Sequence, residues 1–143
     1  MRPSWIRAWL GASLALTITL GACAPNSSTS AGDPSDPAAD SLPDRDPALA
    51  HELVEDHGAL LLDVRSASEF ESGHADGAVL VPHGEVPTRV DEIVELQGGD
   101  KTKPIVVYCR SGYRAGIAKQ SLLDAGFTHV TNVGGLTDYQ SAD

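Results

Sequence analysis

Hydrophobic residues beyond about position 46 follow two alternating patterns. Short apolar runs, typical of strands buried on both faces, occur at 59–64, 78–81 and 105–108, and a last strand is predicted at 128–133. Between these runs, hydrophobic residues recur at helical spacing, and the helices or helical turns predicted from them lie at 47–57, 68–73, 87–96 and 115–125. Strands that alternate with helices through short connections form a parallel sheet with right-handed crossovers. The pattern therefore predicts an α/β fold with a central, mainly parallel sheet.

Capping residues mark where the folded part of the chain begins. Asp46 is a favourable N-cap, and Pro47 suits the first helical position because the N–H that it lacks has no partner there. Glycines that end the three longer helices stand at positions 58, 98 and 126. We therefore expect a single folded domain at 47–143.

The segment before this domain has the composition of a linker. Residues 24–47 contain five prolines and almost no large apolar side chain. Such a segment cannot bury enough surface to offset the entropy lost on ordering. We expect residues 23–46 to form a flexible tether.

The first 22 residues are organised like a secretory signal. Two arginines precede an apolar run at 8–20, which is too short to span a bilayer, so a transmembrane anchor is the weaker interpretation. The sequence Leu20-Gly21-Ala22-Cys23 resembles the lipobox of bacterial lipoproteins. This resemblance implies cleavage before Cys23, lipidation of Cys23 and a place in the bacterial cell envelope, facing the periplasm or the cell exterior. An ordinary secretory signal that ends near a cysteine is the alternative.

Charge and cysteine content exclude several function classes. The chain has 20 acidic residues against 10 lysines and arginines, a net charge of −10, which argues against a nucleic-acid partner. Anionic lipid headgroups would repel such a chain, so we expect membrane contact only through a lipid anchor. Two cysteines, Cys23 and Cys109, are too few for a disulfide scaffold or a four-cysteine zinc site. No metal-ligand spacing relates His51, His57, His83 and His129, and we predict no metal, no cofactor and a monomer.

Cys109 lies between the most strand-like run of the chain and a predicted helix. Ligands of parallel α/β sheets bind at this carboxyl end of the strands. Backbone N–H groups and the dipole of the following helix, together with Arg110 and Arg114, would lower the pKa of the thiol and favour the thiolate. The sequence therefore predicts a reactive nucleophile. The alternative is a small hydrophobic residue buried at the end of a strand.

The string Cys-Arg-Ser-Gly-Tyr-Arg at 109–114 closely resembles the active-site loop of single-domain rhodaneses, the thiosulfate:cyanide sulfurtransferases. Three further stretches resemble signatures of that family: D-V-R with E-F at 63–70, G-H-x-x-G-A at 73–78 and N-V-G-G at 132–135. The resemblance extends from about residue 49 to residue 139. It implies a rhodanese-like fold of three layers, α/β/α.

The resemblance also implies sulfur transfer in two steps. Cys109, the catalytic residue, takes sulfur from a small anionic donor such as thiosulfate and passes it from a persulfide to a thiol or cyanide acceptor. The residues that bind the substrate are then Arg110, Ser111, Gly112, Tyr113 and Arg114. Arg110 and Arg114 would orient the sulfonate of the donor. A structural salt bridge inside the loop is the alternative role for Arg114.

Other functions of this loop remain open. Related cysteine-dependent phosphatases place an arginine six positions after the cysteine, where this chain has Ala115, so the shorter loop favours sulfur over phosphate. A persulfide carrier without turnover and an inactive binding domain are further alternatives. Asp63 and Arg65 are candidates for the border of the site, although pairing with each other is the commoner role of such residues.

The chain departs from the family pattern at both ends of the domain. The family usually has a short strand before its first helix, but residues 41–47 are acidic and contain prolines. Tyr139 stands after the Gly-Gly pair, where a tryptophan is common in the family. We therefore expect the first strand to be missing or rudimentary and the C-terminal helix to be short.

Overall fold

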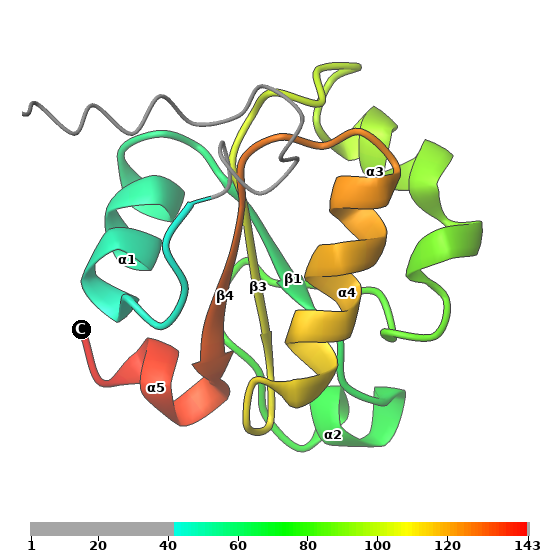
Figure 1. Ribbon diagram of the computed structural model, residues 1–143. Helices are drawn as coiled ribbons and strands as arrows, with labels where there is room; N and C mark the ends of the chain where they lie inside the picture. Colours follow the sequence, from blue (N-terminus) through cyan, green and yellow to red (C-terminus); the bar gives the residue numbers. More distant parts are fainter. Residues whose placement is uncertain (1–41, 143) are drawn as a thin grey trace, which may run out of the picture. The chain divides into compact units, whose positions relative to one another are not determined.

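The computed structural model describes residues 42–142. The predicted signal segment, Cys23 and most of the predicted tether lie outside these residues. The elements, in chain order, are α1 (Pro47–Glu55), β1 (Leu60–Asp63), α2 (Ala67–Glu71), β2 (Val79–Leu80), the 3-10 helix η1 (Val86–Thr88), α3 (Val90–Leu96), β3 (Ile105–Cys109), α4 (Tyr113–Asp124), β4 (Val130–Gly135) and α5 (Leu136–Gln140) (Figure 1).

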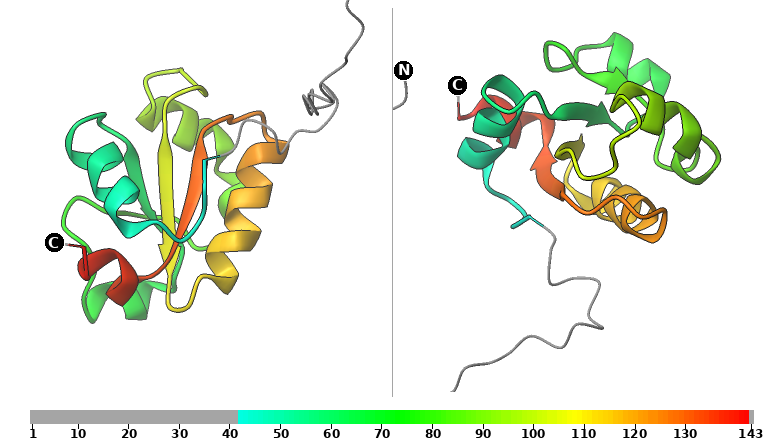
Figure 2. Two further views of the ribbon diagram at one scale, coloured as in Figure 1. Left: turned by 60° about the vertical axis from the view of Figure 1, so that its left-hand side comes forward. Right: turned by 90° about the horizontal axis from the view of Figure 1, so that it is seen from above.

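The strands form one four-stranded sheet in the order β2-β1-β3-β4, and every neighbouring pair is parallel. Helices α3 and α4 cover one face of this sheet, and α1 and α5 cover the other (Figure 2). This arrangement confirms the predicted α/β fold with three layers. The apolar runs of β1 and β3 are explained by it, because strands covered on both faces bury successive side chains in turn against the two helix layers.

Strand β3 shows how the two faces divide the side chains. Ile105, Val107 and Cys109 are buried towards α3 and α4, whereas Val106 and Tyr108 are buried towards α1 and α5. Successive side chains of a strand point to opposite faces, so this alternation places Cys109 on the α4 side of the sheet. Cys109 is also the last residue of β3, at the carboxyl edge of the sheet.

Two helices and the last strand differ from the predicted ranges. Strand β4 (Val130–Gly135) lies two residues later than the predicted 128–133. The expected helix at 87–96 is divided into η1 and α3, because Arg89 between them has φ −111° and ψ 21°, outside the helical region. Helix α4 begins at Tyr113 rather than at residue 115. Its first turn therefore contains Arg114, which the sequence had placed in the loop.

The segment at 42–46, which we call the N-terminal strap, is packed against β4. The Arg45 N–H donates to Asn132 O at 2.9 Å, the Asn132 N–H donates to Asp44 Oδ1 at 2.9 Å, and the Thr131 hydroxyl donates to Pro43 O at 2.6 Å. The predicted linker reached Asp46, so its last five residues, 42–46, belong to the folded domain instead. Hydrogen bonds to β4, an ion pair between Asp44 and Lys119 of α4, and the packing of the partly buried Leu42 side chain hold the strap.

Both ends of the domain are as short as expected. Among the described residues no strand precedes α1, and the strap contributes a single backbone hydrogen bond to β4. Helix α5 has five residues, and its Tyr139 is buried. The Tyr139 ring stacks on His51 of α1 with ring centroids 4.1 Å apart, so this short helix still closes the α1 face of the sheet.

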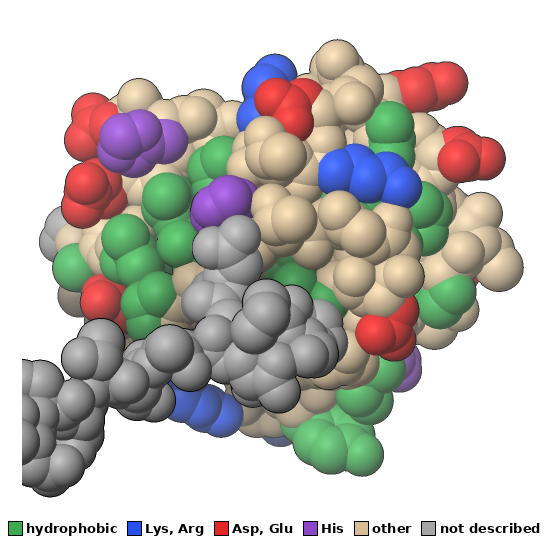
Figure 3. All heavy atoms as spheres, turned by 45° about the horizontal axis from the view of Figure 1, so that its top comes forward, with side chains coloured by type: hydrophobic (Ala, Val, Ile, Leu, Met, Phe, Trp, Pro, Cys, Tyr) green, Lys and Arg blue, Asp and Glu red, His purple; other side chains and the backbone are tan. Residues whose placement is uncertain are grey.

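Figure 3 shows the end of the domain where the strands begin, with acidic, basic and hydrophobic side chains mixed on its surface. A hollow at this end is lined by Leu42, Leu53, His57, Thr102, Pro104 and His129. Cys109 lies at the opposite end of β3. Within residues 42–142, no helix has the length and apolar character needed to cross a membrane.

Candidate active site

The Cys109 sulfur faces the backbone N–H groups of the loop that follows it. The Gly112 N–H donates to Cys109 Sγ at 3.1 Å. Burial raises the pKa of the thiol, but backbone hydrogen bonds from the residues at 111, 112, 114 and 115 outweigh burial, so the pKa of Cys109 lies below its ordinary value. Cys109 is fully buried, as a core residue would also be. The convergence of N–H donors on its sulfur distinguishes it from a residue that only fills space.

Glycine at position 112 is required by the shape of this loop. Gly112 has φ +90°, in the left-handed region, and forms the N-cap of α4. A Cβ atom added there would lie 3.2 Å from the Cα of Gly134, so a side chain would push the loop away from β4. The Asn132 amide nitrogen donates to Gly112 O at 3.0 Å and holds the loop from the same side.

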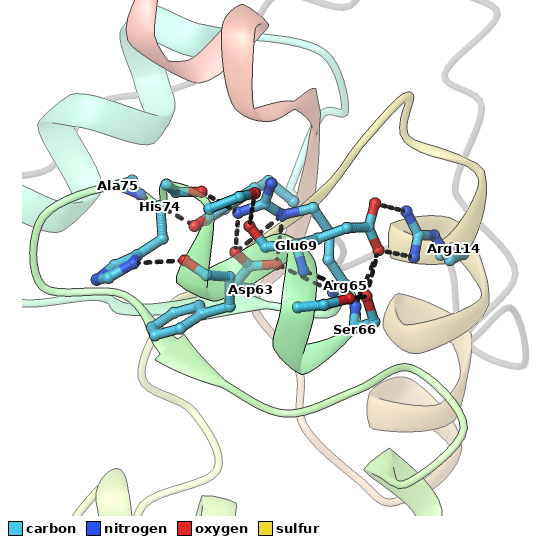
Figure 4. Close-up of polar contacts among 12 residues, drawn as sticks. Asp63, Arg65, Ser66, Glu69, His74, Ala75 and Arg114 are labelled. Atoms are coloured by element: carbon cyan, nitrogen blue, oxygen red, sulfur yellow. Dashed lines mark hydrogen bonds and ion pairs between the residues drawn. The ribbon is translucent and has the colours of Figure 1, made fainter.

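Arg114 forms an ion pair with Glu69 of α2 (Figure 4). Its two terminal nitrogens donate to the two carboxylate oxygens at 2.7 and 2.8 Å. Hydrogen bonds from Arg114 and from the Ser66 backbone hold the pKa of Glu69 well below its usual range. The pair matches the structural salt bridge expected as one of two roles for Arg114, with a partner in α2 rather than in the loop. Substrate binding by Arg114 remains a prediction.

Arg114 also lies within electrostatic reach of the active-site sulfur. Its pKa is raised chiefly by the hydrogen bonds to Glu69 and further by the negative charge of the Cys109 thiolate. The interaction is reciprocal, so the guanidinium favours the thiolate. Arg114 can therefore support the nucleophile without releasing Glu69.

Glu69 belongs to the site because it pairs with Arg114. In the sequence it stood out only as part of the E-F signature, with no role assigned to it. It accepts hydrogen bonds from the Ser66 N–H at 3.0 Å and from the Ser66 hydroxyl at 2.9 Å, which together with the N-cap bond make a capping box at the start of α2. The S-x-x-E spacing at 66–69 was the available signal for the cap. Nothing local in the sequence indicated the second partner, Arg114.

Asp63 and Arg65 pair with each other in the interior. Arg65 Nη2 lies 2.6 Å from Asp63 Oδ2 and donates to Gly73 O at 2.7 Å, and both side chains are buried. The Arg65 guanidinium also lies over the Tyr108 ring, 5.6 Å from its centroid. These contacts tie the end of β1 to the loop after α2, so both residues support the sheet edge beside the site.

The remaining predicted loop residues are exposed. The Tyr113 side chain is 77% exposed and projects into solvent. Within the described part of the chain, the Arg110 side chain forms no hydrogen bond or ion pair. Ser111 contributes its backbone N–H to the Cys109 sulfur. Arg110 is thus available to an anionic ligand.

A further arginine, Arg45, lies against the loop, although the sequence placed it in the linker. Arg45 Nη2 donates to Ser111 O at 3.4 Å. No local pattern pointed to Arg45, because its position depends on the packing of the strap on β4. No group of three or more His, Cys, Asp or Glu side chains that could hold a metal ion occurs at 42–142.

Comparison with known proteins connects this site to a family. The sequence model described as the rhodanese-like domain matches residues 46–142. Thiosulfate sulfurtransferase PspE of Escherichia coli is 39% identical over 77 residues, which cover 54% of this chain and 70% of that protein. A solved structure of a rhodanese with anions from E. coli has a TM-score of 0.51 and 38% identity, and the match covers 56% of this chain and 89% of that one.

A second group of relatives is matched over a smaller share of its length. The tRNA uridine(34) hydroxylase of Hamiltonella defensa is 36% identical over 90 residues, which cover 62% of this chain but only 25% of that protein. The chain therefore spans about a quarter of the hydroxylase and the larger part of PspE.

Proposed function

Since the chain belongs to the rhodanese-like domain family, we propose that it is a sulfurtransferase that moves sulfane sulfur from thiosulfate, or a similar small anionic donor, to a thiol or cyanide acceptor. The observation that carries this proposal is the set of backbone N–H groups around Cys109 Sγ, which lower the pKa of the thiol. A thiolate is the form that attacks sulfur.

The first half-reaction loads the enzyme. Cys109 Sγ attacks the outer sulfur of thiosulfate, the S–S bond of the donor breaks, and sulfite leaves with the bonding electron pair. A persulfide remains on Cys109. Cys109 is buried, which favours small donors over large ones.

The second half-reaction regenerates the thiolate. The acceptor attacks the terminal sulfur of the persulfide, the S–S bond breaks, and its electron pair returns to Cys109. The N–H groups of the loop stabilise the negative charge on sulfur before and after transfer. The chain therefore needs only one nucleophile and a fixed set of donors.

The length of the loop favours sulfur transfer over phosphoryl transfer. The related phosphatases place an arginine six positions after the cysteine, whereas this chain has Ala115 there, inside α4. Arg114, one position earlier, is paired with Glu69. The acidic charge of the chain also gives no support to a tRNA substrate.

We propose in addition that Cys23 is lipidated and that the domain is held at the cell envelope, facing the periplasm or the cell exterior. The lipobox-like residues at 20–23 and the preceding apolar run support this location. The composition of residues 24–41, which include three prolines, supports a role as the spacer between the anchor and the domain.

The catalytic proposal is tested by following both half-reactions in purified full-length protein. We expect thiocyanate formation from thiosulfate and cyanide, and mass spectrometry after thiosulfate alone should show one added sulfur atom on Cys109. C109S is expected to lose both signals. Sulfur loading without thiocyanate formation would instead favour a persulfide carrier, and the absence of loading from any donor would favour an inactive binding domain.

A further inference from the structure

The arginines of the domain fall into two groups. Arg65, Arg89 and Arg114 each form ion pairs with carboxylates. The other two arginines at 42–142, Arg45 and Arg110, form no ion pair there. Both of the unpaired arginines belong to or contact the Cys109 loop. In a chain with a net charge of −10, these two positive charges are available to an anion that approaches the Cys109 loop.

The backbone of Arg45 adopts a conformation that a residue with a side chain seldom takes. Its φ is +59°, and it is the single non-glycine residue with positive φ among those described. The Arg45 N–H is bound to Asn132 O, and Asp44 on its other side accepts a hydrogen bond from the Asn132 N–H. The strap is thus fixed before and at Arg45, which holds the side chain over the end of β4.

The guanidinium of Arg45 occupies space that two glycines leave open. A Cβ atom added to Gly112 would lie 3.0 Å from Arg45 Nη2, and one added to Gly134 would lie 3.6 Å from Arg45 Nη1. The one hydrogen bond of the guanidinium, to Ser111 O, is 3.4 Å long. Asp138 nearby uses its Oδ2 to accept the Gly135 N–H and forms no ion pair with Arg45. Most donors of Arg45 therefore face no partner among residues 42–142.

We propose that Arg45, together with Arg110, recruits small anions with a sulfonate-like group to the Cys109 site. This inference rests on the proposed sulfur transfer, and it assigns recognition of the donor to a residue of the strap. Arg114 is less suited to recruitment, because Glu69 already neutralises its charge. A planar guanidinium suits the oxygens of a sulfonate because it presents paired N–H donors.

The test compares two reagents of similar size that differ in charge. Iodoacetate is an anion and iodoacetamide is neutral, and both alkylate a cysteine thiolate. Their rates at Cys109 in the full-length chain are measured by mass spectrometry of the peptide that contains it. For R45Q we expect the iodoacetate rate to fall about threefold to tenfold, with the iodoacetamide rate within about twofold of wild type. The apparent KM for thiosulfate should rise by a similar factor while kcat stays near that of wild type.

Three further variants control the comparison. K103Q removes the same charge at the opposite end of β3 and should leave the ratio of the two rates unchanged. R45K should retain most of the iodoacetate rate. R45G should behave like R45Q and keep the fold, because glycine is favoured at this positive φ.

Two results would overturn the inference. Equal losses of both alkylation rates in R45Q and R45G would mean that Arg45 shapes the loop rather than attracting anions. Unchanged rates in both variants would mean that it has no part in recognition. The wild-type protein could fail to transfer sulfur from any donor while R45Q still loses only its iodoacetate rate. In that case the proposed function fails, but anion recruitment by Arg45 stands.

Discussion

The Glu69 carboxylate and the Arg114 guanidinium form a two-pronged ion pair, with N–O distances of 2.7 and 2.8 Å, that joins α2 to the first turn of α4. The same carboxylate accepts hydrogen bonds from Ser66 at the start of α2. The turn of α4 that Glu69 holds supplies backbone N–H groups to the Cys109 sulfur. One carboxylate thus connects a helix cap to the position of the nucleophile.

E69Q should lower both stability and the rate of sulfur loading. The pair is about one-quarter to one-third exposed, so solvent screening limits its contribution, and we expect a loss of about 1 kcal/mol in the free energy of unfolding. Urea unfolding at neutral pH measures this loss. E71Q, which removes a charge from the same helix, is the matched control, and an equal loss in E71Q would contradict the specific role of Glu69.

The same pair should make stability depend on pH. Because the folded-state pKa of Glu69 is lowered, its stabilising contribution is complete above the unfolded-state pKa of about 4.3 and is lost as the pH falls towards the folded-state pKa. The difference in unfolding free energy between wild type and E69Q should therefore shrink between about pH 7 and about pH 3. A difference that stays constant over this range would show that the charge of Glu69 does not matter.

R114A should slow the first half-reaction more than the second. Arg114 favours the Cys109 thiolate, so its loss should raise the pKa of the thiol and lower the rate of sulfite release on the order of tenfold at neutral pH. Stopped-flow measurement of sulfite release tests the first step, and transfer of preloaded sulfur to cyanide tests the second. Sulfur loading at the wild-type rate would mean that Arg114 is structural only.

N132A should disturb both the loop and β4. The Asn132 side chain donates to Gly112 O and accepts the Gly134 N–H, each at 3.0 Å, and both contacts are buried. Its removal leaves a carbonyl and an N–H without these partners, which should cost about 2 kcal/mol of unfolding free energy. Thermal unfolding and the thiocyanate assay measure the two effects. A variant with wild-type stability would show that water or another group replaces the amide.

C23S should separate the anchor from the fold. If Cys23 carries the lipid, the variant should lose acylation and leave the membrane fraction, whereas the domain at 42–142 should keep its unfolding temperature and its activity. Mass spectrometry of the N-terminal peptide and cell fractionation provide the measurements. Wild-type protein without an acyl group would contradict the prediction.

The sequence by itself determined the elements that depend on near neighbours. Short apolar runs identified β1 and β3, because a strand covered on both faces buries most of its side chains. Asp46 and Pro47 marked the start of α1, because an N-cap and a first-turn proline act within one helical turn. The alternation of strands and helices predicted the parallel sheet and the position of Cys109 at its carboxyl edge, and the structure confirms both.

Only the tertiary structure decided which charges meet. Arg114 pairs with a carboxylate 45 positions away in the chain, and Arg45 approaches Ser111 across 66 positions. Neither contact has a local signature, because the order β2-β1-β3-β4 and the packing of the strap on β4 determine which segments become neighbours. The composition of the strap predicted a flexible linker at 42–46, because the strap contains few large apolar side chains that it could bury. Hydrogen bonds to the edge of a completed sheet order the strap instead, and these partners exist only once the fold has formed.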